Sequence, residues 1–301
     1  MKEILQKLLL EGPVATDGGW RTELERSGLE AGECADLWNL TKPHLVESVA
    51  RSYVEAGSRI ILTNTFRSNR LALESYSLQE KMEELNRKGV ELSRKASVGK
   101  CFVFATIGPA STLSMAGSLP PGAELKGIFL EQATILAKSG ADGIVLESFH
   151  DLDELLIALH AVKSTGLPIV ASAVFDSGDR TDRMASGQSP ELVALTLAEA
   201  GADVIGANCG MGIEQYLPIC KRLHTATYLP IWMKPNAGRP TLIHGRIVYP
   251  TTGRNFAMYA QVLANLGADF VGGCCGTTPE YIQEMVRTVK KRYRNRLIVQ
   301  M

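Results

Sequence analysis

The sequence predicts an α/β protein folded as a (β/α)8 TIM barrel, and three observations lead to this fold. Eight short runs of aliphatic and β-branched residues recur along the chain, most of them separated by a helical segment. Three of these runs follow the same phrase, Gly-Ala-Asp, which is typical of a helix that ends at a glycine before a buried strand. No Gly-x-Gly-x-x-Gly turn follows the first run, which disfavours an open doubly wound sheet, the main rival.

The expected elements follow one another in a regular order. An amphipathic helix at residues 2–10 precedes eight strands, which are expected at residues 14–17, 59–64, 102–107, 143–147, 168–174, 204–208, 230–234 and 270–273. A closing helix is expected at about residues 279–293, because Thr278 can cap it and Pro279 suits its first position. Since no linker interrupts the series, residues 1–301 are expected to form a single domain.

The composition excludes several classes of function. Hydrophobic residues make up 45% of the chain, which is ample for one large core. The 32 basic and 32 acidic residues are interspersed, so no surface for nucleic acid is expected. No apolar stretch reaches the roughly 20 residues needed to cross a membrane, and the N-terminus does not read as a signal peptide. Six cysteines are too few for a disulfide scaffold, which favours a reducing, cytoplasmic location.

Polar residues follow most of the expected strands. In a barrel of this type the carboxyl ends of the strands meet at one mouth, and the chemistry takes place there. A barrel with a purely structural role has little reason to collect such groups, so we expect an active site at this end. The sequence places two carboxylates, two amides and three thiols at the mouth, namely Asp17, Asn64, Glu147, Cys209, Asn236, Cys274 and Cys275.

The three cysteines predict a zinc site. Cys209 follows the sixth strand, while Cys274 and Cys275 follow the eighth in a glycine-flanked turn that lets backbone and metal approach closely. Three thiolates leave one of the four zinc positions open, as in catalytic sites. The alternatives are simple core packing of the thiols, a strained disulfide between the two neighbours with a redox-sensing role, and an iron–sulfur cluster, which usually needs four thiolates.

The other groups at the mouth allow two interpretations each. Asp17 and Glu147 can each cap the helix that follows, but together beside a soft metal they indicate a pocket for an ammonium group. Residues 236–253, which include His244, are rich in glycine and proline and form a candidate lid. Aromatic residues after several strands either roof the barrel or face a cationic or flat methyl donor, and these are Trp20, Phe66, Phe149 and Phe175.

Together these motifs resemble the homocysteine S-methyltransferase family, which includes betaine–homocysteine methyltransferase, enzymes that use S-methylmethionine, and the homocysteine-binding module of cobalamin-dependent methionine synthase. The resemblance covers essentially the whole chain. Residues 63–66 and 186–188 are more similar to the methionine synthase module than to the other members. Trp20-Arg21 differs from the smaller residues that many relatives have at this position, so the donor pocket is left unassigned. The matching motifs are Asp17-Gly18-Gly19, Thr63-Asn64-Thr65-Phe66, Ile107-Gly108-Pro109, Glu147, Asn208-Cys209 and Gly272-Gly273-Cys274-Cys275-Gly276.

The resemblance implies a homocysteine-binding (β/α)8 barrel in which Cys209, Cys274 and Cys275 hold Zn²⁺. The sulfur of homocysteine would take the fourth position, which Asn236 can occupy when substrate is absent. Asp17 and Glu147 would hold the amino group of homocysteine, and Asn64 is a further expected substrate contact. Methyl transfer to the activated thiolate would then give methionine.

The methyl donor is not set by the sequence. Zinc with three thiolates carries a net negative charge, which favours cationic or activated donors such as a methylcorrinoid, protonated methylfolate, S-methylmethionine or a betaine-like compound. The sequence contains no cobalamin or folate module, so we expect a free donor or one carried by a separate corrinoid protein. Two alternatives stay open: a thiol-binding module of a multi-protein methyltransferase system, and methyl transfer to a different thiol.

Overall fold

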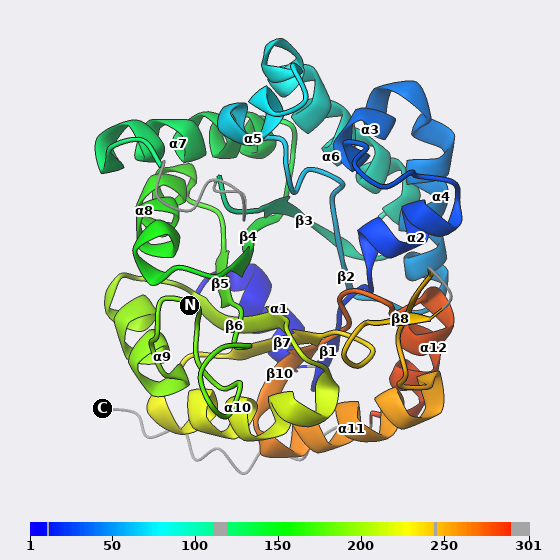
Figure 1. The fold of residues 1–301 in the computed structure, drawn as a ribbon, viewed down its shortest axis with the longest axis vertical. Coiled ribbons are helices and arrows are strands. Elements are labelled where there is room, and N and C mark those ends of the chain that lie inside the picture. Colours follow the sequence, from blue (N-terminus) through cyan, green and yellow to red (C-terminus); the bar gives the residue numbers. More distant parts are fainter. Residues whose placement is uncertain (11, 111–118, 244–245, 290–301) are drawn as a thin grey trace.

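The structure, a computed structural model, describes residues 1–10, 12–110, 119–243 and 246–289. Eight parallel strands form one sheet in the order β1-β10-β7-β6-β5-β4-β3-β2. A parallel bridge between Thr16 and Ile60 joins the two end strands, so the sheet closes on itself. Helices surround the ring of strands, and the predicted (β/α)8 barrel is confirmed (Figure 1).

Each of the eight predicted strands is present. They are β1 (Val14–Ala15), β2 (Ile60–Leu62), β3 (Phe102–Ile107), β4 (Gly143–Phe149), β5 (Ile169–Ala173), β6 (Val204–Cys209), β7 (Ile231–Pro235) and β10 (Ala268–Val271). The helices are α1 (Glu3–Leu10), α2 (Trp20–Arg26), α3 (Trp38–Thr41), α4 (Pro43–Glu55), α5 (Arg70–Glu74), α6 (Met82–Ser97), α7 (Gly122–Lys138), α8 (Leu152–Val162), α9 (Pro190–Glu199), α10 (Ile213–Ala226), α11 (Gly253–Leu266) and α12 (Pro279–Thr288). No helix in these described segments is both long and apolar enough to cross a membrane.

The Gly-Ala-Asp phrases mark the entry to three strands, as expected. Their glycines have positive φ angles of 94°, 89° and 119°, which ends the preceding helix where a side chain would be strained. Each aspartate accepts a hydrogen bond from a backbone N–H at or near the start of the neighbouring strand, which fixes the strand register at the amino-terminal end of the barrel. The three pairs are Asp142 with Val103, Asp203 with Ile169, and Asp269 with Ile231, at 2.8, 3.0 and 3.0 Å.

The last helix differs in detail from the expectation. α12 begins at Pro279 as expected but ends at Thr288, and residues 290–293 of the predicted helix lie outside the described residues. Thr278 stands at the N-cap position, yet its side chain accepts no backbone hydrogen bond from the helix. Its hydroxyl bonds the carboxylate of Glu280 instead, so the two side chains satisfy each other at the helix start.

The candidate lid contains a hairpin that the sequence did not predict. Within residues 236–253, β8 (Thr241–Ile243) pairs with β9 (Arg246–Val248) in antiparallel register. Its apolar side chains are largely exposed, with 74% of Leu242 and 63% of Ile247 accessible. Because these side chains are exposed, the hairpin lacks the pattern of buried apolar residues by which a strand is normally recognised in a sequence. His244 lies outside the described residues.

Helix α1 closes the inner end of the barrel. Its residues Leu5, Leu8 and Leu9 join a cluster of side chains that point into the barrel from the strands, among them Phe104, Val145, Trp232 and Phe270. Trp232 stacks on Phe104 with ring centroids 6.5 Å apart and contacts Phe270 at 5.5 Å. The interior is therefore packed from α1 up to the mouth, and the polar groups gather above this apolar layer.

This packing predicts that Leu8→Ala lowers the free energy of unfolding by about 2 to 5 kcal/mol, because it opens a cavity beneath the barrel. Leu8 is 1% exposed, whereas Leu10 on the same helix is 87% exposed, so Leu10→Ala should change stability by less than about 0.5 kcal/mol. Urea denaturation of the two variants measures the difference. Equal midpoints would contradict a structural role for α1.

Candidate functional site

The three predicted cysteines meet at the mouth of the barrel. The Sγ atoms of Cys209 and Cys274 are 2.9 Å apart, and those of Cys274 and Cys275 are 4.0 Å apart. All three sulfurs lie within 4.8 Å of one another. Thiolates about 2.3 Å from one tetrahedral zinc ion would lie roughly 3.8 Å apart, a value between the two separations. The cluster is therefore able to hold a metal ion.

The electrostatics of the cluster also fit a cation. Hydrogen bonds to Cys274 and Cys275, together with burial, raise the pKa of the Cys209 thiol well above its ordinary value. Hydrogen bonds from the other two thiols lower the pKa of Cys275. One thiol of the trio thus ionises readily while another resists, because adjacent thiolates repel each other. A divalent cation among the sulfurs would remove that repulsion.

Asn208 holds the end of β6 in place. Its Oδ1 accepts hydrogen bonds from the backbone of Ser148 at 2.9 Å and from the hydroxyl of Ser172 at 2.6 Å. Its amide nitrogen donates to the Ser148 hydroxyl at 2.6 Å, which lies 3.3 Å from the Cys209 sulfur. Ser148 and Cys209 both have positive φ angles, 61° and 59°, which are unusual for residues with a side chain. The network spans β4, β5 and β6 and offsets the cost of this backbone geometry.

The glycines before the cysteine pair allow close packing of the chain. A Cβ atom on Gly272 would lie 2.0 Å from the hydroxyl of Thr16, and one on Gly273 would lie 2.3 Å from the hydroxyl of Thr277. The backbone here is tied to neighbouring strands, since Gly273 donates to the Asp17 carbonyl and Cys274 donates to the Pro235 carbonyl. A side chain at either glycine would displace the turn and separate the sulfurs.

Asn236 provides a test of whether the site fits a metal. Its amide nitrogen donates to the Gly210 carbonyl at 2.7 Å, next to Cys209. Its Oδ1 is buried and has no hydrogen-bond partner within the described residues. A buried oxygen with an unused lone pair is costly unless something else satisfies it, and a cation does so. The residues present fit the predicted zinc ion, and the role of Asn236 as a fourth ligand remains a prediction.

A buried lysine, not predicted from the sequence, lies at the centre of the site. Lys234 on β7 is 1% exposed, and its Nζ lies 2.6 Å from Asp17 Oδ1 and 3.6 Å from Glu147 Oε1. Asp17 is fully buried, and its Oδ2 accepts from the Trp20 indole and the Leu62 backbone, both at 2.7 Å. Burial alone lowers the pKa of Lys234, but the Asp17 and Glu147 carboxylates outweigh burial and raise it. The lysine is therefore a fixed positive charge.

Glu147 is the carboxylate with most freedom to bind a ligand. It lines the mouth cavity, and its nearest cation, Lys234, is closer to Asp17. Burial raises the pKa of Glu147 to about 7, and attraction to Lys234 only partly offsets this. Its charge therefore changes near neutral pH, and a ligand ammonium would favour the ionised form. The expected roles of Asp17 and Glu147 towards an ammonium group remain predictions.

One cavity joins these groups to the aromatic residues at the mouth. Its volume is about 390 Å³, and its walls include the three cysteines, Glu147, Lys234, Asn64, Trp20 and Phe66. Asn64 donates its amide to Ala35 and Asn39, so much of its hydrogen bonding holds the loops together. Thr106 also lines the cavity, and its buried hydroxyl has no partner within the described residues. Two of the four predicted aromatics reach the cavity, while Phe149 and Phe175 are buried in the core.

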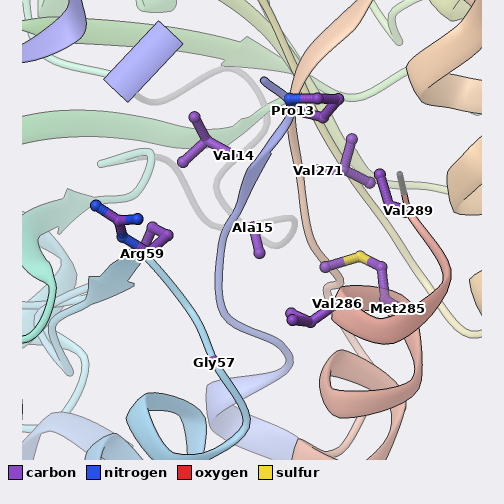
Figure 2. A pocket seen from close by; sticks show the side chains of 9 residues that line it. All are labelled: Pro13, Val14, Ala15, Gly57, Arg59, Val271, Met285, Val286 and Val289. Atoms are coloured by element: carbon purple, nitrogen blue, oxygen red, sulfur yellow. The ribbon is translucent and has the colours of Figure 1, made fainter. Parts of the chain in front are cut away.

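A second cavity, of about 400 Å³, lies between β1 and α12 (Figure 2). Val14, Val271, Met285 and Val286 surround it, and Arg59 stands at its edge. No thiol or carboxylate is among the described residues that line it. The mouth cavity, where the chemical groups converge, is therefore the candidate active site.

Comparison with known proteins agrees with this assignment. The family model described as "Homocysteine S-methyltransferase" matches residues 14–289. The chain is similar to the methionine synthases of Mycobacterium tuberculosis, at 29% identity, and Mycobacterium leprae, at 27%, with 95% of the chain aligned in both cases. It spans only 25% of the length of either protein.

Solved structures share the fold. The metallated form of the homocysteine methyltransferase MmuM from Escherichia coli matches with a TM-score of 0.77 at 23% identity, covering 94% of this chain and 98% of that one. The oxidized form of the same protein matches with a TM-score of 0.79 at 23% identity, covering 95% and 99%. At this identity the likeness establishes the barrel architecture.

The sulfur cluster predicts that the purified protein binds about one zinc ion per chain. Cys274→Ser should lose most of this zinc, because a neutral hydroxyl replaces one of three thiolates. Cys220→Ser is the matched control, since Cys220 is buried and bonds the Leu263 carbonyl away from the site. Metal content is measured by mass spectrometry of elements after dialysis. Full zinc occupancy in the Cys274 variant would refute the three-cysteine site.

Proposed function

Because this chain belongs to the homocysteine S-methyltransferase family, we propose that it transfers a methyl group to the sulfur of homocysteine and forms methionine. The observation that carries the proposal is the convergence of three thiols with Glu147 and Lys234 in one cavity. The thiols suit a metal that binds the acceptor sulfur, and the charged pair suits the amino-acid end of the acceptor. Both ends of homocysteine thus have partners in the same space.

The three cysteines would hold zinc, and Asn236 Oδ1 would occupy the remaining position until substrate enters. Zinc would supply the lowered thiol pKa that makes the acceptor sulfur a thiolate at neutral pH. The protein keeps the cysteines in place through Asn208 and the two glycines before the pair. The Ser148 hydroxyl, 3.3 Å from the Cys209 sulfur, would tune the charge on that ligand by hydrogen bonding.

The charges on Asp17, Glu147 and Lys234 support a binding position for the substrate ammonium. Lys234 neutralises Asp17 at 2.6 Å, so the trio carries one net negative charge when Glu147 is ionised. One negative charge matches one substrate ammonium, and Glu147 would be its main contact. The partnerless hydroxyl of Thr106 would donate a hydrogen bond to the substrate carboxylate.

The barrel contributes orientation to the reaction. Binding the amino-acid end at Glu147 and the sulfur at the cysteine cluster leaves the sulfur facing the rest of the cavity, where the donor enters. Such positioning of two reactants is potentially worth several kcal/mol of the barrier. The reacting sulfur attacks the methyl carbon, and the bond between that carbon and the donor atom breaks with its electron pair kept by the donor.

The greater length of the related methionine synthases favours a second candidate function. The chain aligns with a quarter of each methionine synthase, so the matching region is one part of a larger protein there. Here the same part would bind and activate homocysteine and receive the methyl group from a separate corrinoid protein. A different acceptor thiol is the remaining alternative, and a panel of thiols tested with one donor distinguishes it.

The proposal predicts methionine formation by zinc-loaded protein with homocysteine and one of a panel of donors: a methylated corrinoid protein, methyltetrahydrofolate, S-methylmethionine and glycine betaine. Methionine is detected by mass spectrometry. Cys274→Ser should abolish the product, while Cys220→Ser should retain it. Absence of homocysteine binding to the zinc-loaded protein, measured by calorimetry, would reject the proposed acceptor.

The raised pKa of Glu147 predicts a pH dependence of homocysteine binding. The carboxyl has a pKa of about 7, so it is mostly ionised above that pH and mostly protonated below it. The KM for homocysteine should therefore rise roughly tenfold as the pH falls from about 8 to about 6, because the ammonium loses its negative partner. Glu147→Gln should raise KM throughout and remove this dependence. The same slope in wild type and variant would assign the titration to another group.

A further inference from the structure

Lys234 belongs to the strand that lies between the two parts of the sulfur cluster. In the sheet, β7 has β6, which ends at Cys209, on one side and β10, which precedes the turn of Cys274, on the other. Lys234 pairs in register with Asn208, directly before Cys209. The carbonyl of Pro235, the next residue, accepts a hydrogen bond from the Cys274 backbone at 2.9 Å. The backbone around Lys234 is thus tied to both segments that carry the thiols.

The side chain of Lys234 points into the barrel. Trp232, two residues earlier on β7, belongs to the inner apolar cluster, and alternate residues of a strand face the same side. The side chain of Lys234 is only 1% exposed, and its Nζ lies 2.6 Å from Asp17 Oδ1. It lines the mouth cavity together with the three cysteines. A fixed positive charge is therefore enclosed in the cavity into which the sulfurs face.

The ion pair with Asp17 does not cancel the effect of Lys234 on the sulfurs. Hydrogen bonding with Cys209 lowers the pKa of the Cys274 thiol, hydrogen bonding with Cys275 and burial raise it above its ordinary value, and the charge of Lys234 lowers it again. For Lys234 itself, burial lowers the pKa, whereas the two carboxylates and the Cys274 thiolate raise it. A positive charge that acts on one thiolate of the cluster also acts on a further thiolate bound beside it.

Binding of the acceptor would increase the negative charge near Lys234. Zinc with three thiolates carries a charge of −1, and a fourth thiolate brings the sum to −2. The acceptor thiol would lose its proton to solvent as its sulfur takes the fourth position from the neutral oxygen of Asn236. Methyl transfer turns the thiolate into a neutral thioether, so the added charge disappears again. A fixed cation in this cavity therefore stabilises bound homocysteine more than bound methionine.

We propose that Lys234 stabilises the acceptor sulfur as a thiolate at the cysteine cluster and thereby distinguishes homocysteine from methionine. This inference rests on the proposed methyl transfer and adds to it a residue that selects the acceptor by the charge of its sulfur. Lys234 acts through space, and its pair with Asp17 holds the Nζ in place. The same charge favours release of the product, because methionine brings no negative sulfur to the cluster.

The test removes the charge of Lys234 and compares two ligands that share the same amino-acid end. Lys234→Met leaves Asp17 without its cation, so Asp17→Asn/Lys234→Met, which removes both charges, is the second variant. Calorimetry with zinc-loaded protein at a single pH gives the Kd for homocysteine and the Kd for methionine. Because the amino-acid end contributes to both, the ratio of the homocysteine Kd to the methionine Kd isolates the effect on the sulfur.

This ratio should rise roughly 10- to 100-fold in Lys234→Met, the effect expected for a unit charge within about 10 Å in a partly buried site. In the double variant it should rise roughly 3- to 10-fold, since loss of the Asp17 charge offsets part of the effect. Lys234→Arg keeps the charge and should retain a ratio closer to that of wild type. Under turnover, the KM for homocysteine should rise while kcat does not fall, because a thiolate without a nearby cation is the stronger nucleophile.

Cobalt-loaded protein gives a measurement that does not depend on turnover. Thiolates bound to Co²⁺ absorb in the near ultraviolet through charge transfer from sulfur, so a titration with homocysteine reports the fourth thiolate directly. The homocysteine concentration at half-maximal absorbance change should rise in both variants. Lys88→Met is the matched control, because Lys88 pairs with Glu91 at 2.7 Å on α6 and lies outside the cavity. It should leave the ratio and the titration unchanged.

The outcomes separate this proposal from the proposed function. An unchanged ratio in the double variant with full zinc content would show that Lys234 is only the structural partner of Asp17 and would overturn the proposal. Loss of zinc from the double variant would also indicate a structural role and reject it. If homocysteine binds wild type without any change in the cobalt absorbance, the acceptor sulfur does not reach the metal, and the proposed function fails instead. The double variant decides the matter where Lys234→Met does not fold.

Discussion

The buried ion pair between Lys234 and Asp17 is the constraint around which the site is arranged. Both side chains are almost fully inaccessible, and they join β7 to the end of β1 across the barrel interior. A charge in this position is stable only with its partner, because removing either one leaves an uncompensated charge that costs about 3–5 kcal/mol. The pair therefore marks the boundary between the apolar layer formed with α1 and the polar groups of the mouth. Asp17 thus has its partner inside the protein, whereas Glu147 lines the mouth cavity.

The sulfur cluster depends on a second constraint, the geometry at the ends of β4, β6 and β10. Positive φ angles at Ser148 and Cys209 turn the backbone sharply where the strands end. Asn208 compensates for the strain because its side chain bonds Ser148 on β4 and Ser172 on β5 at once. The cysteine pair is held by backbone bonds to Asp17 and Pro235. Sulfurs far apart in the sequence thus meet because strand β6 carries one of them and a hydrogen-bonded turn directly after β10 carries the other two.

The sequence predicted the features that carry a local signal. Buried parallel strands are short apolar runs, Gly-Ala-Asp repeats mark their entrances, and three cysteines at strand ends suggest a metal. Lys234 was missed because a lysine at the end of an apolar run is normally taken for a solvent-exposed residue, and its partner is 217 residues away. The β8–β9 hairpin was missed because its exposed side chains lack a burial pattern.

The charged groups of the cavity act on one another. Glu147, Lys234 and the three cysteines line the same cavity. Burial raises the pKa of the Glu147 carboxyl, attraction to Lys234 lowers it, and repulsion from the Cys274 thiolate raises it again. A cation bound among the sulfurs would remove this repulsion and favour the ionised carboxylate, so metal binding at the cysteines and binding of a cationic group at Glu147 would support each other.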